Sequence, residues 1–166
     1  PLEGLMMATR CGDVDPAVLI ALQREAGLAP AEVERLLATQ SGLLGVSGLS
    51  ADMRVLLASD DARSRLAVDM FCHRARKVLG AYLAVLRGAD GIVFGGGIGE
   101  NAPAVRERIL DVFEWAGLAL DAAANAACAG REACISRADS RIQVWVVPVD
   151  EASELATQAL SLRDTP

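Results

Sequence analysis

The stretch that decides the fold reads Ile92-Val-Phe-Gly-Gly-Gly-Ile-Gly-Glu-Asn-Ala-Pro103. Its β-branched and aromatic residues are typical of a strand, and its proline is typical of the first turn of a helix. The glycines between them lack the Cβ atom that keeps a ligand away from backbone N–H groups, and they allow positive φ in a tight turn. Because a helix N-terminus attracts anions, the segment predicts a nucleotide-binding loop, with Asn101 capping the helix that follows.

The sequence on both sides of this loop predicts an α/β fold. Apolar, β-prone residues predict a buried strand over 89–94 and a central strand over 143–149, with a brief edge strand over 133–136. Apolar spacing and helix-start residues predict helices over 16–26, 31–39, 60–87 and 102–116, and a last one that begins at Asp150 or Glu151. No repeat or long linker interrupts the chain, so we expect residues 1–166 to form a single unit.

Two segments carry more specific expectations. Ser41–Ser50 holds three glycines and three serines among apolar residues, which predicts a buried loop or short strand whose backbone approaches another segment closely. Within the long helix, apolar residues at steps of three and four predict a stripe that faces the core, made of Ala67, Phe71, Ala75, Val78, Tyr82 and Val85.

Composition argues against several classes of protein. The net charge of −6 predicts no nucleic-acid partner, because such proteins normally carry a basic face. No apolar stretch reaches the roughly 18 residues that span a bilayer, so we expect no membrane segment. The four cysteines form no C-x-x-C pair, which predicts neither a zinc site nor a disulfide framework and fits a reducing cytoplasm. All basic residues except Lys77 are arginines, which we expect mostly on helix surfaces.

The glycine loop alone leaves alternatives open. Gly97-Ile-Gly-Glu-Asn-Ala102 also fits the dinucleotide pattern G-x-G-x-x-A, and Asp121 follows at about the distance of a ribose-binding acid, about twenty residues on. A dinucleotide-dependent oxidoreductase is therefore one interpretation. Against it, that fingerprint usually follows the first strand of its domain, whereas a long helix precedes it here. The glycines could also serve only as a tight connection.

Three blocks of sequence, in this order, narrow the choice. They are Pro1-Leu-Glu-Gly-Leu-Met-Met-Ala-Thr-Arg-Cys-Gly-Asp-Val-Asp15, Ser41-Gly-Leu-Leu-Gly-Val-Ser-Gly-Leu-Ser-Ala-Asp-Met-Arg54 and Gly97-Ile-Gly-Glu-Asn101. Together they resemble the acetate kinases, and the resemblance covers essentially the whole chain and the C-terminal portion of that family. It implies the fold shared by sugar kinases, Hsp70 and actin. This chain would be an incomplete C-terminal ribonuclease-H-like domain, helix-rich with a few central strands, whose opening strands and N-terminal domain lie upstream of Pro1.

The resemblance also implies an activity. Members transfer the γ-phosphoryl group of ATP to acetate or propionate with Mg²⁺, giving an acyl phosphate and ADP, and they are cytoplasmic homodimers that pair through this part. Other catalytic groups of the family lie upstream of Pro1, so we expect this chain to need its N-terminal domain and to be inactive alone. The alternative is a non-catalytic module that binds adenine nucleotide or mediates dimerisation, and the NAD-dependent oxidoreductase is less favoured.

The resemblance assigns roles to two residues near the start of the chain. Arg10 corresponds to the arginine that steadies the transferring phosphoryl group and the substrate carboxylate, which suits an always-protonated guanidinium. A salt bridge from Arg10 to Asp13 or Asp15 is the alternative that the local sequence allows. Pro1 corresponds to a proline that lines the pocket for the acetate methyl group.

The remaining assignments concern the nucleotide and the metal. By resemblance, Asp52 lies near the ribose hydroxyls and Met53 and Arg54 lie near the adenine, with Met53 where phenylalanine is common. From the sequence alone this segment predicts a helix start capped by Ser50. The other resemblance-based residues are Gly97, Ile98 and Asn101 along the adenosine and α-phosphate, after a Gly95-Gly96 pair where Thr-Ala is more usual, and Glu151, which helps to position Mg²⁺.

Overall fold

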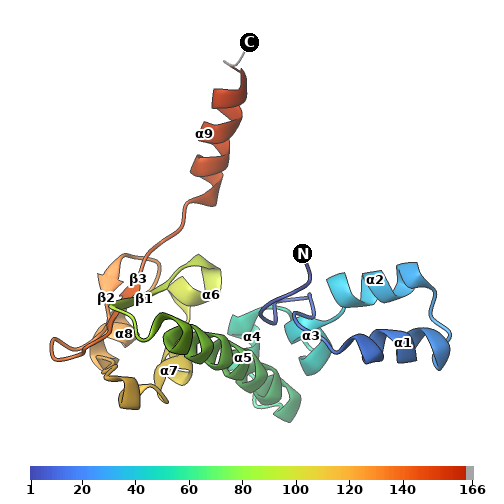
Figure 1. Ribbon diagram of the computed structural model, residues 1–166, viewed down its shortest axis with the longest axis horizontal. Coiled ribbons are helices and arrows are strands. Elements are labelled where there is room, and N and C mark those ends of the chain that lie inside the picture. The colour runs from blue at the N-terminus through green and yellow to red at the C-terminus, as the bar shows by residue number, and fades with distance from the viewer. Residues whose placement is uncertain (164–166) are drawn as a thin grey trace. The chain divides into compact units, whose positions relative to one another are not determined.

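The computed structural model describes residues 1–163 of the chain (Figure 1). Contacts group it into two compact units, and each is described by itself. The first unit comprises Pro1–Ala89 together with Arg108–Val112, and the second comprises Asp90–Glu107 and the residues from Phe113 onward. Both units lie within residues 1–166, which the sequence predicts to form a single structural unit. The division by contacts does not test that prediction, so it stays a prediction.

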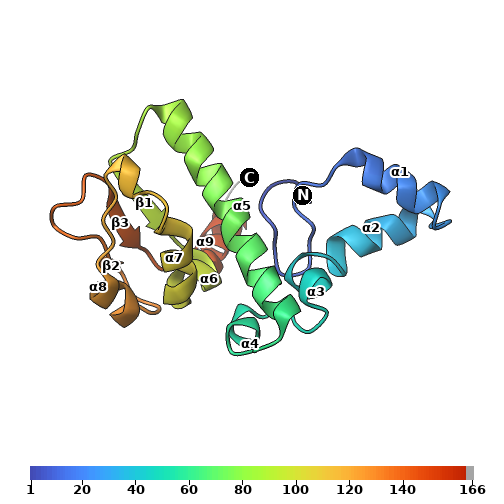
Figure 2. The same ribbon diagram turned by 90° about the horizontal axis from the view of Figure 1, so that it is seen from below.

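The first unit begins with 15 residues without helix or strand and continues with a pair of helices. They are α1 (Pro16–Arg24) and α2 (Pro30–Thr39), which lie side by side in both views (Figures 1 and 2). Each helix begins with a proline, whose fixed φ suits the first turn and whose missing N–H is not needed there. Asp15 caps α1 by accepting a hydrogen bond from the Ala17 N–H. Both helices are confirmed within two residues of the predicted bounds.

The next segment corrects one prediction. Residues Gly42–Ser47 form helix α3, so the predicted buried loop or short strand is wrong. Gly48 ends the helix in the left-handed conformation at φ 64°, and Gly42 begins it at φ 61°. The expectation of a close backbone approach is confirmed, because a Cβ atom added to Gly42 would overlap the carbonyl oxygen of Met7. Glycine therefore sets the two boundaries of a short helix here, without preventing the helix between them.

Two further helices complete most of the first unit. They are α4 (Met53–Leu57) and the long α5 (Ala62–Leu86), and both α3 and α4 pack against α5 (Figure 2). Segment 108–112 joins this unit through α5, since the Arg76 guanidinium pairs with the Asp111 carboxylate at 2.7 Å. The predicted helix over 60–87 is confirmed.

The predicted core stripe of α5 is only partly right. Ala67 is buried, but Tyr82 and Val85 are 62% and 78% exposed. The buried residues of α5 are Ser64, Ala67, Val68, Cys72 and Leu83. Serine and cysteine are small enough to lie on a packed helix face, so the face that packs includes residues that an apolar-only pattern leaves out. The predicted stripe is rotated from this face and runs onto exposed surface toward the end of the helix.

The second unit contains a small three-stranded sheet. Its strands are β1 (Gly91–Phe94), β2 (Ala133–Cys134) and β3 (Gln143–Val146), in the order β1-β3-β2. Strand β3 is parallel to β1 and antiparallel to β2. The predicted edge strand and central strand are confirmed, and so is the helix-rich α/β class with a small sheet.

The predicted burial of the first strand is wrong. Among residues 1–163, β1 pairs with β3 alone, and the Val93 side chain is 64% exposed. In contrast, Val144 and Val146 of the central strand are fully buried. A strand with one neighbour leaves one row of backbone groups and part of its side chains uncovered, whatever its apolar content.

The helices of the second unit lie between and after its strands along the chain. The glycine segment forms a short helix, α6 (Gly96–Asn101), and the predicted helix over 102–116 divides into α7 (Pro103–Leu110) and a 3₁₀ turn, η1 (Glu114–Ala116). Helix α8 (Ala122–Ala127) precedes β2, and α9 (Glu151–Arg163) begins where predicted, with Asp150 accepting a hydrogen bond from the Ser153 N–H at 3.0 Å. No helix in the described part of the chain has the length and apolar character needed to cross a membrane.

Candidate functional site

The loop that carries Arg10 is anchored to the start of α3. The carbonyl oxygens of residues 7–9 accept hydrogen bonds from the first free N–H groups of that helix. Leu43 donates to Met7 at 2.9 Å, and the neighbouring N–H groups of Leu44 and Ser41 donate to Ala8 and Thr9. The N-terminal donors of α3 therefore hold the protein's own backbone.

The end of α2 anchors the same loop from the other side. The Cys11 N–H donates to the Leu37 carbonyl at 3.0 Å, and the Thr9 hydroxyl donates to the Ala38 carbonyl at 3.3 Å. Residues 7–11 are thus fixed between two helix ends without forming a helix or strand themselves. The backbone of Arg10 is held on both sides while its side chain is exposed.

The side chain of Arg10 lies next to Pro1. Its Nη1 donates to the Pro1 carbonyl oxygen at 3.4 Å, so the structure brings these two predicted residues together. Asp13 instead pairs with Arg74 at 3.1 Å, and Asp15 caps α1. Within residues 1–163 no ion pair joins Arg10 to either carboxylate, so the salt-bridge alternative is wrong. Of the five N–H donors of an arginine, the Arg10 guanidinium uses one in the hydrogen bond to Pro1.

A cavity of about 420 Å³ in the first unit lies close to this loop. Its apolar walls include Met6, Val14, Leu36 and Met70, while the Arg74–Asp13 ion pair contributes charged side chains. Arg10 does not line the cavity. The predicted substrate-binding residues Pro1 and Arg10 are therefore not among the residues that line this cavity, which is open to the surface.

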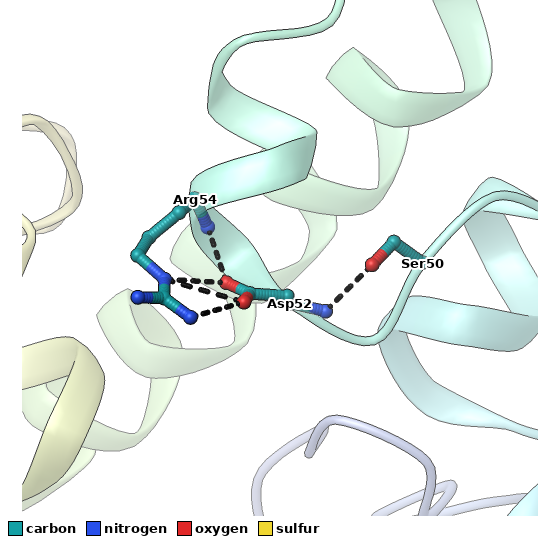
Figure 3. Close-up of polar contacts among 3 residues, drawn as sticks. All are labelled: Ser50, Asp52 and Arg54. Carbon is teal, nitrogen blue, oxygen red and sulfur yellow. Dashed lines mark hydrogen bonds and ion pairs between the residues drawn. The ribbon is translucent and has the colours of Figure 1, made fainter.

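The segment Asp52-Met53-Arg54 forms the start of α4 (Figure 3). Asp52 itself is the cap, accepting from the Arg54 N–H at 2.9 Å, and Ser50 Oγ accepts from the Asp52 N–H at 3.0 Å. The helix start is confirmed, but Ser50 as its cap is wrong by two residues. Serine and aspartate are both common helix caps, so the residue types alone do not decide whether Ser50 or Asp52 caps α4.

Asp52 and Arg54 also form an ion pair, with Arg54 Nη2 at 2.6 Å from Asp52 Oδ2 (Figure 3). The hydrogen bonds from the Arg54 side chain and then from its backbone lower the pKa of Asp52 to about 2. Met53 behaves differently from its two neighbours, because it is only 3% exposed and belongs to the core. An ionised, accessible carboxylate and an exposed guanidinium thus lie at the start of α4, while Met53 between them is packed inward.

The glycine segment has one open side. Nothing lies within 4 Å of a Cβ atom built on Gly96 or Gly97, whereas one on Gly95 would lie 2.8 Å from Val149 Cγ2. The prediction that Asn101 caps the next helix is wrong, since its Nδ2 donates to the Gly97 carbonyl at 3.0 Å inside α6. The Ala102 carbonyl accepts the first helical hydrogen bonds of α7 in its place.

Arg106 is a functional candidate that the sequence did not reveal. Its side chain is fully buried, unlike most arginines in residues 1–163, which are exposed as the sequence predicts. Nη1 donates to the carbonyls of Gly99 and Glu100 at 2.8 and 3.0 Å, so this guanidinium contacts the last turn of α6 directly. Burial lowers its pKa from the usual value. The only sequence signal is its place in the first turns of a helix that follows the glycine segment.

Glu151 is the first residue of α9 and its side chain is exposed. Residues 1–163 contain no group of three or more histidine, cysteine or acidic side chains that could hold a metal ion by themselves. Mg²⁺ commonly needs only one or two protein carboxylates, because phosphate oxygens and retained waters complete its shell. A single accessible carboxylate such as Glu151 fits that donor set.

Comparison with known sequences points to one family. A model of the acetokinase family matches residues 1–157. The acetate kinase of Solibacter usitatus is 53% identical over 99% of this chain and 39% of its own length, and that of Chloroherpeton thalassium is 46% identical over 94% of this chain and 39% of its own length. The chain therefore spans about two fifths of the length of these relatives.

Solved structures similar to this chain come from the same group of kinases. The acetate kinase of Porphyromonas gingivalis has a TM-score of 0.90 at 40% identity, covering 99% of this chain and 42% of its own. A propionate kinase of Francisella tularensis has a TM-score of 0.81 at 34% identity, covering 91% of this chain and 39% of its own. The dinucleotide-binding alternative loses its basis, because Gly97 and Gly99 lie inside α6 and not in a turn before a helix.

Proposed function

This chain belongs to the acetokinase family, and we propose that it is part of an enzyme that transfers the γ-phosphoryl group of ATP to acetate or propionate. The products are an acyl phosphate and ADP. The observation that carries the proposal within the structure is Arg10, an exposed guanidinium that has no carboxylate partner among residues 1–163 and lies on a loop fixed between α2 and α3.

Arg10 is the catalytic residue of the proposal. A guanidinium stays protonated at any working pH and its planar fork matches both a carboxylate and the equatorial oxygens of a phosphoryl group. A short-chain carboxylate is already ionised at neutral pH, so transfer depends mainly on alignment and charge neutralisation. An arginine on a fixed backbone provides both, and we propose that Pro1 borders the acyl group beside it.

We propose nucleotide-binding roles for residues of each unit, taken by itself. In the first unit, the ionised Asp52 accepts hydrogen bonds from ribose hydroxyls and Arg54 lies near the base. The resemblance implies that Met53 lies near the base as well, and because its side chain is buried we propose that it supports the other two from the core. In the second unit, Gly97, Ile98 and Asn101 line the adenosine and α-phosphate along the open side of α6. Glu151 helps to hold Mg²⁺, whose charge neutralises the phosphates when it is bound.

The remaining parts of the proposal concern the whole enzyme. We propose that the N-terminal domain supplies the other catalytic groups, that this chain alone is inactive, and that the enzyme is a cytoplasmic homodimer. These statements rest on the family alone, because the chain spans about two fifths of its relatives.

A hydroxamate assay for acyl phosphate tests the proposal. The chain is mixed with ATP, Mg²⁺ and acetate or propionate, alone and together with an N-terminal polypeptide of an acetate kinase. We expect no acyl phosphate from the chain alone and acyl phosphate from the mixture. Arg10→Ala should abolish the activity of the mixture, whereas Arg35→Ala on the exposed surface of α2 should leave it unchanged.

The other outcomes are equally informative. Activity of the mixture that survives Arg10→Ala removes Arg10 from catalysis. A folded mixture that is silent but binds adenine nucleotide points to a non-catalytic module, and activity from the chain alone shows that the upstream groups are dispensable.

A further inference from the structure

We infer that Arg106 is a positioning residue for α6, holding the end of that helix so that its open side stays in place for the nucleotide. The inference rests on the proposed function, because α6 matters only if it binds nucleotide. It assigns Arg106 no contact with the ligand, only contacts with the backbone that would carry the ligand.

The guanidinium of Arg106 uses all its donors. Arginine has five N–H groups in a fixed fork, and here each one has an acceptor. Besides the two bonds to Gly99 and Glu100, Nε donates to Asn125 Oδ1 at 2.8 Å, and Nη2 donates to the carbonyls of Asn125 and Cys128 at 2.9 and 2.6 Å. A buried cation with every donor satisfied has a single orientation, so it also fixes the groups it binds.

The acceptors share one property: they lie where helices end. Gly99 and Glu100 belong to the last turn of α6, and Asn125 and Cys128 lie at the end of α8. Carbonyl groups of a last turn carry partial negative charge and can accept from groups outside their helix, as the Asn125 carbonyl does here besides accepting from the Cys128 N–H at 3.2 Å. The side chain contacts no carboxylate among its five acceptors, so the carbonyl dipoles of two helix ends stabilise the charge.

Glu100 extends this anchorage to the rest of the second unit. Its carbonyl also accepts from the Gly130 N–H at 3.2 Å, and its Oε1 accepts from the Val149 N–H at 2.9 Å. The end of α6 is therefore bound at several points, while the side around Gly97 has none of these contacts. Because Gly96 to Glu100 is barely more than one helical turn, moving its anchored end moves its open side as well.

A lysine cannot reproduce this arrangement. It keeps the charge, but its three donors radiate from one nitrogen and cannot bridge two helix ends as a planar fork does. Arg106→Lys is thus the informative variant, since it separates the geometry of the fork from the presence of a buried cation. Arg106→Met removes both.

The experiment measures binding of a fluorescent ADP analogue with Mg²⁺, together with hydrogen exchange of the amides of residues 97–101. We expect Arg106→Lys to weaken nucleotide binding roughly 10-fold or more, by analogy with displaced binding groups elsewhere. We also expect faster exchange in α6. Arg131→Met is a matched control, because Arg131 donates to the Ala127 carbonyl at 3.2 Å near the same helix end but is exposed.

A second control separates positioning from general stability. Val144→Ala removes buried volume from β3 and destabilises the second unit without touching the Arg106 contacts. We expect it to lower the unfolding midpoint while nucleotide affinity and α6 exchange stay near wild-type. If Val144→Ala weakens binding as much as Arg106→Lys does, the effect is one of stability and the inference is overturned.

The remaining outcomes keep the two proposals apart. Wild-type affinity and wild-type exchange in Arg106→Lys overturn the positioning role while leaving nucleotide binding intact. If the wild-type chain binds no nucleotide, the proposed nucleotide site fails, and with it any positioning of α6 for a nucleotide, whatever the exchange rates show.

Discussion

Replacing Gly42 by alanine tests how the Arg10 loop is held. Gly42 has φ 61°, and a Cβ atom there would overlap the Met7 carbonyl oxygen and lie 2.8 Å from that of Arg10. Gly27 offers a matched control, with φ 68° and nothing within 4 Å of an added Cβ. The two substitutions share the backbone strain and differ only in the overlap.

The magnitude follows from that difference. A left-handed conformation costs a residue with a Cβ atom roughly 1–2 kcal/mol. Alanine recovers about 0.4–1 kcal/mol of this by restricting the unfolded chain. Gly27→Ala should therefore lower the free energy of unfolding by no more than about 1–2 kcal/mol. Overpacking against backbone adds about 1–3 kcal/mol, so Gly42→Ala should exceed the control by that amount.

Urea unfolding of both variants measures this difference. Relief of the overlap requires the 7–10 loop to move, and the hydrogen bond from Leu43 to Met7 lies directly beside the new methyl group. We therefore also expect the complemented activity assay to fall for Gly42→Ala, with activity near wild-type for Gly27→Ala. Equal unfolding free energies for the two variants would refute the claim that the space at Gly42 matters.

Three further predictions concern single side chains. The pKa of Asp52 in the folded chain is about 2, below its usual 3.8, so its contribution to stability is present above pH 3.8 and is lost as the pH falls toward 2. A carboxyl NMR titration should show this lowered pKa, and Asp52→Asn should abolish the loss of stability between these two pH values. Ser64 Oγ is buried and finds no hydrogen-bond partner in the described chain, so Ser64→Ala should raise the free energy of unfolding by about 1 kcal/mol in urea, whereas a loss would reveal a hidden partner. Burial raises the pKa of the Cys72 thiol, so maleimide should label the half-buried Cys11 and Cys134 well before it, as mass spectrometry of peptides would show.

Much of the secondary structure could be predicted because its signals are local. Pro16 and Pro30 mark helix starts, Asp150 caps the last helix, and the run from Gln143 is β-prone over its whole length. The errors occur where a local signal permits two outcomes. The glycines of 42–48 suggested a loop, yet two of them have positive φ only because they are the ends of a helix.

Burial was harder to predict than helix or strand, because it depends on neighbours that no local pattern contains. The β1 sequence is as apolar as that of a central strand, and its exposure comes from having one partner. Tyr82 and Val85 continue an apolar periodicity onto exposed surface, while Ser64 and Cys72 are buried although neither belongs to that periodicity. Apolar periodicity indicates that a helix has an apolar face, but packing against its neighbours decides which of its faces is buried.

The candidate site shows the same division between local and distant causes. Arg10 and the 52–54 segment could be found because their motifs are contiguous in sequence. Arg106 could not, because its acceptors lie at residues 99, 100, 125 and 128, and all of them except Asn125 Oδ1 are backbone carbonyls, which leave no trace in residue type. A buried arginine balanced by a carboxylate would have left a partner to search for. A buried arginine that is balanced by the ends of two helices can be recognised only when both helices and their ends are known. Arg106, which we infer to hold the predicted nucleotide-binding segment, is therefore the residue that sequence patterns were least able to reveal.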